Sequence, residues 1–309
     1  MMTRRAFLRC AAAAGLADTL GAPAESDSEL PVIDSHAHFW NPARLDYPWL
    51  NGSPIGGAKL PVDYFRETAG CGVEKVVFVQ ADCRPEQARQ EVDWVASLAR
   101  EEPRIAAVVA FAPVEKPAEI GPALEKLARC PLVKGVRRLV QGEPALDFCA
   151  RPEFVAGVKL VGAKGWNFEI GAREEQLSAA AKLVEQCPAV NFVLDHLGVP
   201  DIARGSLHPW SEHLRRLASF PNVTCKVSGA ITRADWKNWR AEQLRPFIDV
   251  AFEAFGFERV MFGGDWPVCL LAGGWRRWLD ALREITRGRT DGEKRRLFSE
   301  NARRCYGLK

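Results

Sequence analysis

The sequence predicts an α/β protein with a distorted TIM (β/α)₈ barrel, and two observations carry this prediction. Eight short apolar runs rich in Val, Ile and Phe alternate with amphipathic stretches of helical period, which is the pattern of βαβ units around a parallel sheet. Polar residues follow several of these runs rather than one, as they do at the catalytic end of a barrel. A doubly wound sheet, the main alternative, would gather them in one crevice.

The expected strands and helices follow one another without a linker or a change of composition. The strands lie at 31–40, 74–82, 104–114, 133–141, 165–172, 191–198, 222–230 and 258–267. The clearest helical patterns lie between them, at 85–101, 119–130, 173–188 and 211–221. The apolar runs are short enough for buried strands, whereas the helical patterns repeat apolar residues three or four positions apart. We therefore expect one domain over residues 29–309.

The N-terminal segment, residues 1–28, is predicted to be an export signal of the twin-arginine type. The letters TRRAFL at 3–8 precede an Ala-rich apolar stretch, and APA at 22–24 fits a small-residue cleavage site. A basic tail that leads into an Ala-rich helix is the alternative. We expect a periplasmic or secreted protein if the segment is a signal, and a cytoplasmic one otherwise.

Composition narrows the range of partners. The chain has 42 Lys and Arg against 39 Asp and Glu, a formal net charge of +3, so it lacks the basic excess of a nucleic-acid binder. The body contains no uncharged apolar run long enough to span a bilayer, so we expect no membrane anchor in the mature chain. The cysteines after residue 28 are scattered, which predicts buried free thiols, although an exported chain could pair some of them.

Residues with catalytic chemistry recur at several of the expected strands. His36 and His38 are two positions apart and therefore share a strand face, together with Asp34 and opposite Ile33. His196 and Asp265 follow the sixth and eighth apolar runs. Ionisable groups inside a barrel are costly unless they share a site, so this pattern predicts a cluster. Imidazoles beside a carboxylate suit zinc binding or the activation of water.

Several stretches that hold these residues resemble the amidohydrolase superfamily. They are IDSHAHFWNPARLDYPWL, GVRRLVQ, FVLDHLGVPDI, NVTCKVSGAIT and RVMFGGDWPVCLLAGGW. They look most like the branch that holds sugar-acid lactonases of the L-fuconolactonase and L-rhamnonolactonase types and 2-pyrone-4,6-dicarboxylate hydrolase. The resemblance implies hydrolysis of a small-molecule lactone. Asp265 matches the family's general base, and His36, His38 and His196 match histidines that bind a metal or the lactone carbonyl.

The resemblance implies one divalent metal ion, with zinc as the first choice, or none. A metal would be held by His36, His38, His196 and Asp265. Members with two metals use a bridging Lys or Glu on the fourth strand and a His on the fifth. Here the fifth run offers Glu169 and no His, and Lys134 lies at the wrong end of its strand, so we expect no binuclear site.

Four further residues are predicted to bind substrate. Arg137 matches an arginine of the family and would hold a substrate oxygen or carboxylate. Lys226 and Glu169 either contact the substrate or pair with each other inside the barrel. Trp40 follows the first strand and either stacks on a sugar ring or covers the barrel. Arg138 has the opposite parity to Arg137, which predicts an ion pair outside the barrel.

Two other functions compete with lactone hydrolysis. A metal-dependent decarboxylase or hydratase of the same superfamily would use the same residue types. A non-catalytic exported carbohydrate-binding barrel would not need Asp265. The chain could also form an oligomer, a state for which the sequence holds no signal.

Overall fold

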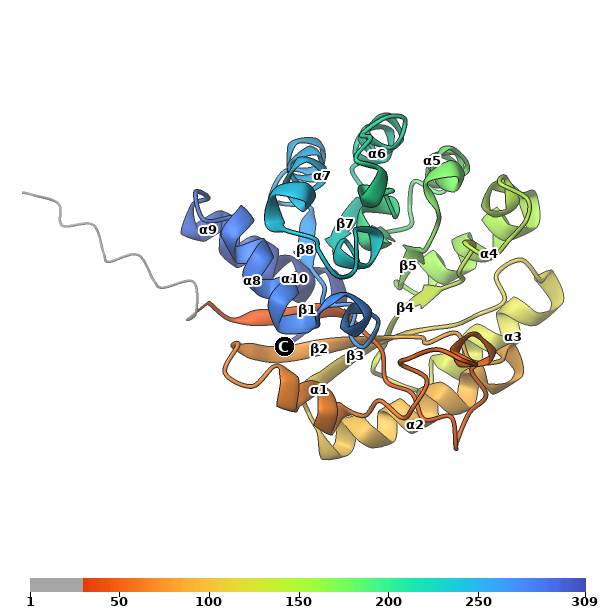
Figure 1. Ribbon diagram of the computed structural model, residues 1–309. Helices are drawn as coiled ribbons and strands as arrows, with labels where there is room; N and C mark the ends of the chain where they lie inside the picture. Colours follow the sequence, from red (N-terminus) through yellow and green to blue (C-terminus); the bar gives the residue numbers. More distant parts are fainter. Residues whose placement is uncertain (1–29) are drawn as a thin grey trace, which may run out of the picture.

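The computed structural model describes residues 30–309 and confirms the predicted barrel (Figure 1). Eight parallel strands pair in chain order, each with the next. They are β1 (Val32–Ala37), β2 (Val73–Val79), β3 (Ile105–Ala110), β4 (Val133–Arg137), β5 (Asn167–Ile170), β6 (Phe192–Leu194), β7 (Val223–Val227) and β8 (Val260–Phe262). Every one of them lies within one of the predicted runs or overlaps it, because strands buried on both faces are rich in apolar residues.

Helices surround this sheet and connect its strands (Figure 1). They are α1 (Pro61–Glu67), α2 (Ala88–Glu101), α3 (Pro117–Leu127), α4 (Pro152–Ala163), α5 (Leu177–Gln186), α6 (Trp210–Ala218), α7 (Ala241–Phe255), α8 (Trp275–Ile285), α9 (Asp291–Arg295) and α10 (Asn301–Tyr306). Three of them begin with proline, whose fixed φ and missing N–H suit the first helical turn.

The seam between β1 and β8 is closed by the segments that carry the predicted catalytic residues. The Asp265 amide donates to the His36 carbonyl (2.7 Å), and the His38 amide donates to the Trp266 carbonyl (2.7 Å). The same two hydrogen bonds that close the barrel therefore also fix the positions of the H-x-H and G-G-D-W-P stretches.

The strand face predicted for Asp34 is wrong. Ile33 packs inside the barrel against Val77 and Met261, whereas Asp34 points outward to Tyr64 and Trp275 on the surrounding helices. The β1–β2 register shifts between Asp34 and Ala37. This bulge breaks the simple alternation and returns the next histidine to the interior.

Asp34 joins β1 to the turn that precedes Asp265. Its buried carboxylate accepts hydrogen bonds from the Gly264 amide (2.8 Å), the Trp275 indole (2.7 Å), the Tyr64 hydroxyl (2.9 Å) and the His36 amide (3.0 Å). Burial raises the pKa of Asp34, and these donors oppose the rise.

We expect Asp34→Ala to lower the free energy of unfolding by about 3 kcal/mol or more, because several buried donors lose their acceptor. Thermal and urea unfolding would measure the loss. Tyr64→Phe, which removes one donor of the set, should cost about 1 kcal/mol. Equal midpoints for wild type and Asp34→Ala would contradict this account.

Two further expectations concern the chain as a whole. The eight cysteines of the described residues are all unpaired, and all but Cys305 are buried, which confirms the predicted free thiols. Among the helices of residues 30–309, none combines the length and apolarity that a membrane crossing requires. The predicted export signal at 1–28 lies outside the described residues.

Candidate active site

The predicted catalytic residues meet at a cavity of about 360 Å³ at the carboxyl ends of the strands. His38, His196, Asp265 and Arg137 line it. His36 lies just beneath them and is fully buried. The structure thus brings together five side chains that follow or occupy β1, β4, β6 and β8, as the barrel topology predicts.

The three histidines converge on one carboxylate oxygen. The Nε2 atoms of His36, His38 and His196 lie 3.9, 3.5 and 3.9 Å from Asp265 Oδ1. The Nε2 atoms of His36 and His38 are 3.2 Å apart. Four electron-rich atoms therefore surround one small volume.

The other ring nitrogen of each histidine has a partner from a different strand. Nδ1 of His38 donates to the Val79 carbonyl (2.7 Å), which can only accept. Nδ1 of His196 pairs with the Ser228 hydroxyl (2.8 Å). Nδ1 of His36 lies 3.3 Å from the Asp195 carboxylate and 3.2 Å from the Lys226 ammonium. Such partners fix the ring orientation and direct each Nε2 toward the cavity.

Two catalytic candidates sit on left-handed backbone. His196 and Asp265 both have φ of 53°, and they follow the short strands β6 and β8 by two and three residues. Strained positions of this kind are held only where the surroundings determine them, and they cluster at functional sites. Gly229 is packed against the His196 ring, where a Cβ would come within 2.7 Å of Nδ1, so a larger residue there would displace the imidazole.

A buried layer of charge supports the histidines from below. The Lys226 ammonium contacts Glu169 (2.5 Å) and Asp195 (3.2 Å), and the Tyr306 hydroxyl of α10 donates to Glu169 (2.5 Å). Burial raises the pKa of Glu169 to about 7, against the attraction of Lys226. Burial also acts to raise the pKa of Asp195, yet Lys226 and other neighbouring positive groups hold it well below its usual range.

Burial and the charge of Lys226 favour neutral histidines, against the opposing charge of Asp195. Burial lowers the pKa of His36 well below its ordinary value, and the nearby Lys226 lowers it further. Burial also lowers the pKa of His196. Neutral imidazoles offer lone pairs, which a metal ion or a hydrogen-bond donor of the substrate can use.

Arg137 connects the buried layer to the cavity. Its guanidinium lies 3.1 Å from Asp195 Oδ2 and 3.3 Å from His36 Nε2, and it donates to the Gln80 carbonyl (2.6 Å). Only 4% of the residue is exposed. A guanidinium held in this way is a preorganised positive charge at the edge of the cavity.

Three residues predicted to bind substrate do not line the cavity. Lys226 and Glu169 form the interior ion pair that was the other interpretation of them. Trp40 is fully buried, and its indole donates to the Gly57 carbonyl (2.9 Å). Its neighbour Trp49 lines the cavity instead and is 41% exposed. Lys226, Glu169 and Trp40 therefore support the site from beneath, because strand interiors and covered loops lie below the open surface of the cavity.

Sequence reasoning missed the role of Asp195 and several residues at the cavity mouth. Asp195 contacts His36, Arg137 and Lys226, and its place directly before His196 in the D-H pair was the available signal. Asp82 and Arg233 line the cavity from the loops after β2 and β7. Nothing in a loop sequence indicates such convergence. Arg138 pairs with Glu115 and Glu143 outside the barrel, as predicted.

The donor set fits one divalent metal ion. His36, His38 and Asp265 offer ligand atoms within 4.8 Å of one another, and so do His36, Asp195 and His196. Atoms bound to zinc at about 2.1 Å in a tetrahedron lie roughly 3.4 Å apart, close to the separations found here. Glu169, the residue of the fifth strand that could serve a second ion, is tied to Lys226.

Glu91 of α2 adds a buried acid behind the site. Its carboxylate accepts from the Ala81 amide (3.1 Å). Burial raises its pKa from the ordinary 4.5 to about 8, against that amide and the charge of Arg137. The folded protein therefore keeps a proton that the unfolded chain releases, so this group makes stability fall as pH rises from about 4.5 to about 8.

We expect Glu91→Gln to remove that fall, because the amide can still accept from Ala81 but no longer titrates. The variant should exceed the wild type in free energy of unfolding at pH 8 by up to a few kcal/mol, since each pKa unit corresponds to about 1.4 kcal/mol. Unfolding midpoints between pH 5 and 8 would measure it. Glu101→Gln, at an exposed end of the same helix, is the control, and parallel pH profiles for wild type and Glu91→Gln would refute the argument.

A family model described as Amidohydrolase matches residues 33–308. The chain belongs to this amidohydrolase family. The family predicted from the motifs is thereby confirmed, and the match spans nearly the whole barrel, including every residue of the histidine–aspartate cluster.

Two relatives named as lactonases and one solved structure match about nine tenths of this chain. An L-fucono-1,5-lactonase of Burkholderia multivorans is 33% identical, with 89% of this chain and 96% of the relative covered. An L-rhamnono-gamma-lactonase of Scheffersomyces stipitis is 21% identical over 91% of this chain and 100% of the relative. A crystal structure of a B. multivorans amidohydrolase with bound zinc has a TM-score of 0.82 and 32% identity, covering 90% of this chain and all of that one.

Proposed function

We propose that this amidohydrolase opens the ring of a sugar-acid lactone by adding water to its carbonyl. The observation that carries the proposal is the convergence of three histidine Nε2 atoms on Asp265 at the floor of a cavity. The relatives named as lactonases support the substrate class, since the match to this chain spans nearly the whole length of each relative.

In the proposed reaction Asp265 is the general base. It takes a proton from water while the water oxygen attacks the lactone carbonyl carbon. The negative charge that develops on the carbonyl oxygen is stabilised by Arg137, whose guanidinium is already fixed by Asp195 and Gln80. Collapse breaks the ring C–O bond, and Asp265 returns its proton to the leaving oxygen, which gives the hydroxy acid.

A single divalent ion fits the same residues. His36, His38, His196 and Asp265 would hold it, and when bound it would supply an electrophile that polarises the carbonyl. The relative with zinc supports this assignment. Asp195, Val79 and Ser228 would then act as the partners that orient its ligands.

The test measures lactone hydrolysis and metal content on the same purified protein. The panel would hold 1,5- and 1,4-lactones of several sugar acids, assayed before and after chelation and after zinc is restored. We expect turnover of at least one sugar lactone. A loss on chelation that zinc reverses would support the metal assignment, whereas full activity without metal would remove it.

The competing functions are outcomes of the same experiment. Carbon dioxide release from aromatic acids without lactone turnover would favour a decarboxylase. Reversible sugar binding without any product would favour the non-catalytic barrel. Either result would overturn the lactonase proposal.

We also propose export by the twin-arginine route, on the strength of the motif at 3–8 and the small-residue site at 22–24. Replacement of Arg4 and Arg5 by lysine should retain the protein in the cytoplasm in a cell-fractionation assay. Unchanged periplasmic delivery of that variant would contradict this route.

A further inference from the structure

We propose that a groove between α2 and α3 binds a glycosyl substituent on the lactone, so that the enzyme acts on a lactone attached to a second sugar. This inference rests on the proposed lactonase function. It names the substrate as a disaccharide-type aldonolactone rather than a single ring.

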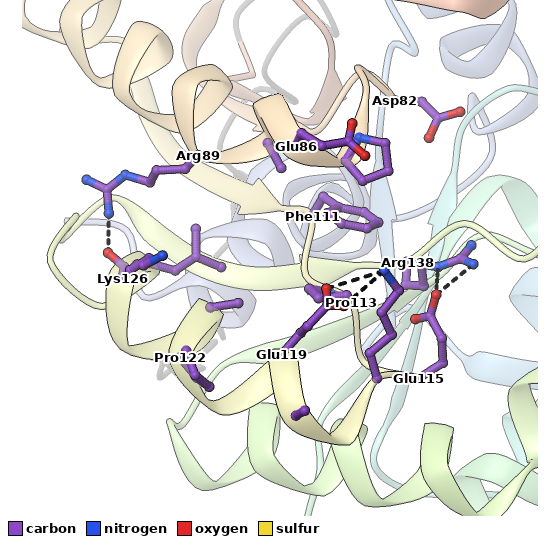
Figure 2. A pocket seen from close by; sticks show the side chains of 16 residues that line it. Asp82, Glu86, Arg89, Phe111, Pro113, Glu115, Glu119, Pro122, Lys126 and Arg138 are labelled. Carbon is purple, nitrogen blue, oxygen red and sulfur yellow. Dashed lines mark hydrogen bonds and ion pairs between the residues drawn. The ribbon is translucent and has the colours of Figure 1, made fainter.

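The groove is larger than the catalytic cavity and lies beside it. Its volume is about 590 Å³. Phe111 and Pro113 form its floor beyond the end of β3, and residues of the segment that begins α2 and of α3 form its walls (Figure 2). A cavity of this size suits a small organic ligand.

The two cavities have one lining residue in common. Asp82 lines both of them. At the end of β4, Arg137 and Leu139 line the catalytic cavity, whereas Arg138 lines the groove. This is the alternation expected of extended chain. A substituent on a ligand in the catalytic cavity would therefore reach the groove past Asp82.

The chemistry of the groove suits a neutral polar ring. Its charged residues balance, with Asp82, Glu86, Glu115 and Glu119 against Arg89, Lys116, Lys126 and Arg138. Such a balance gives no net attraction for a phosphate or a polyanion. Apolar surface from Phe111, Pro85 and Pro113 lies among these polar groups, which is the mixture that binds an amphipathic small molecule.

Some polar side chains of the groove are held by ion pairs, whereas others are free to bind a ligand. Arg138 is held by Glu115 (2.9 Å) and Glu143 (2.5 Å), so it forms a rigid edge. Among the described residues, the carboxylates of Asp82 and Glu86 accept no hydrogen bond and form no ion pair, and both side chains are exposed. They are free to accept hydrogen bonds from sugar hydroxyl groups. The backbone of Asp82 has φ of 57°, which places this acceptor at the boundary.

The test compares two substrates that share one lactone ring. Glucono-1,5-lactone is the plain substrate, and cellobionolactone, which carries a glucosyl group, is the extended one. We expect kcat/KM for the extended substrate to equal or exceed that for the plain one. Ala118→Trp, an exposed position of α3 that lines the groove, should lower kcat/KM for the extended substrate tenfold or more and change the plain substrate less than twofold.

Controls separate the possible failures. Leu160→Trp adds similar bulk to an exposed position of α4 and should change neither substrate. If the wild type hydrolyses the plain lactone but Ala118→Trp leaves the ratio of the two kcat/KM values unchanged, the groove proposal fails while the lactonase proposal stands. If no lactone of the wider panel is hydrolysed, the proposed function itself fails. If an aryl-substituted lactone alone responds to Ala118→Trp, the groove binds a different substituent and the glycosyl assignment is wrong.

Discussion

Asp265→Asn should reduce kcat for lactone hydrolysis by about 10²–10⁴-fold, the usual contribution of a general base. Asparagine has the same shape and tolerates left-handed backbone, so it can keep the φ of 53° found at this position. What it loses is the ability to accept a proton from water. KM should change little, because the carbonyl would still meet Arg137 and the histidines.

The metal content of the variant decides between two causes of inactivity. A variant that binds the wild-type amount of zinc and is inactive has lost the base, whereas one that binds less has lost a ligand. The matched control is Asp147→Asn, which should be fully active. Asp147 is an exposed carboxylate whose ion pair does not involve the cluster. Near-normal turnover by Asp265→Asn would exclude Asp265 as the base.

Lys226→Met should both destabilise the protein and abolish most activity. The ammonium is fully buried and contacts Glu169, Asp195 and His36. Removal of one partner from a buried ion pair costs about 3–5 kcal/mol, because the remaining charge has no compensation. His36 also loses a contact at Nδ1, so its Nε2 should be held less firmly toward the cavity.

A second substitution distinguishes charge balance from packing. In Lys226→Met/Glu169→Gln the uncompensated carboxylate is neutralised, so part of the stability should return while activity stays low. Lys134→Met, in β4 and only half-buried, is the control and should have little effect on either quantity. Unfolding midpoints and kcat together measure the outcome, and a Lys226→Met protein with wild-type stability would contradict the proposed layer.

The sequence predicted the features that follow from regular periodicity. Buried parallel strands are rich in apolar residues, so their positions and number could be predicted, and the polar residues at their ends could be assigned to one end of the barrel. The face of Asp34 was mistaken because a bulge in β1 interrupts the alternation. No local pattern marks a bulge, since it is set by the register of the neighbouring strand.

The interior layer could be predicted only as a set of alternatives. Lys226 and Glu169 are polar positions on separate strands, and only their distance shows that they pair rather than contact substrate. Tyr306 joins them from α10, far along the chain from either. The cavity mouth was less predictable still, because loop residues such as Asp82 and Arg233 are placed by packing and not by periodicity.

The alternation of Arg137 and Arg138 also constrains how the gene can change in length. A single codon gained or lost within β4 would exchange the two guanidiniums between the catalytic cavity and the groove, since a one-residue slip reverses every side chain of a strand. In the loops after β2 and β7 the side chains do not alternate between two faces, so a change of length there has no such effect. Length variation among descendants of this enzyme should therefore collect in those loops, where it alters substrate preference, and should be purged from β4.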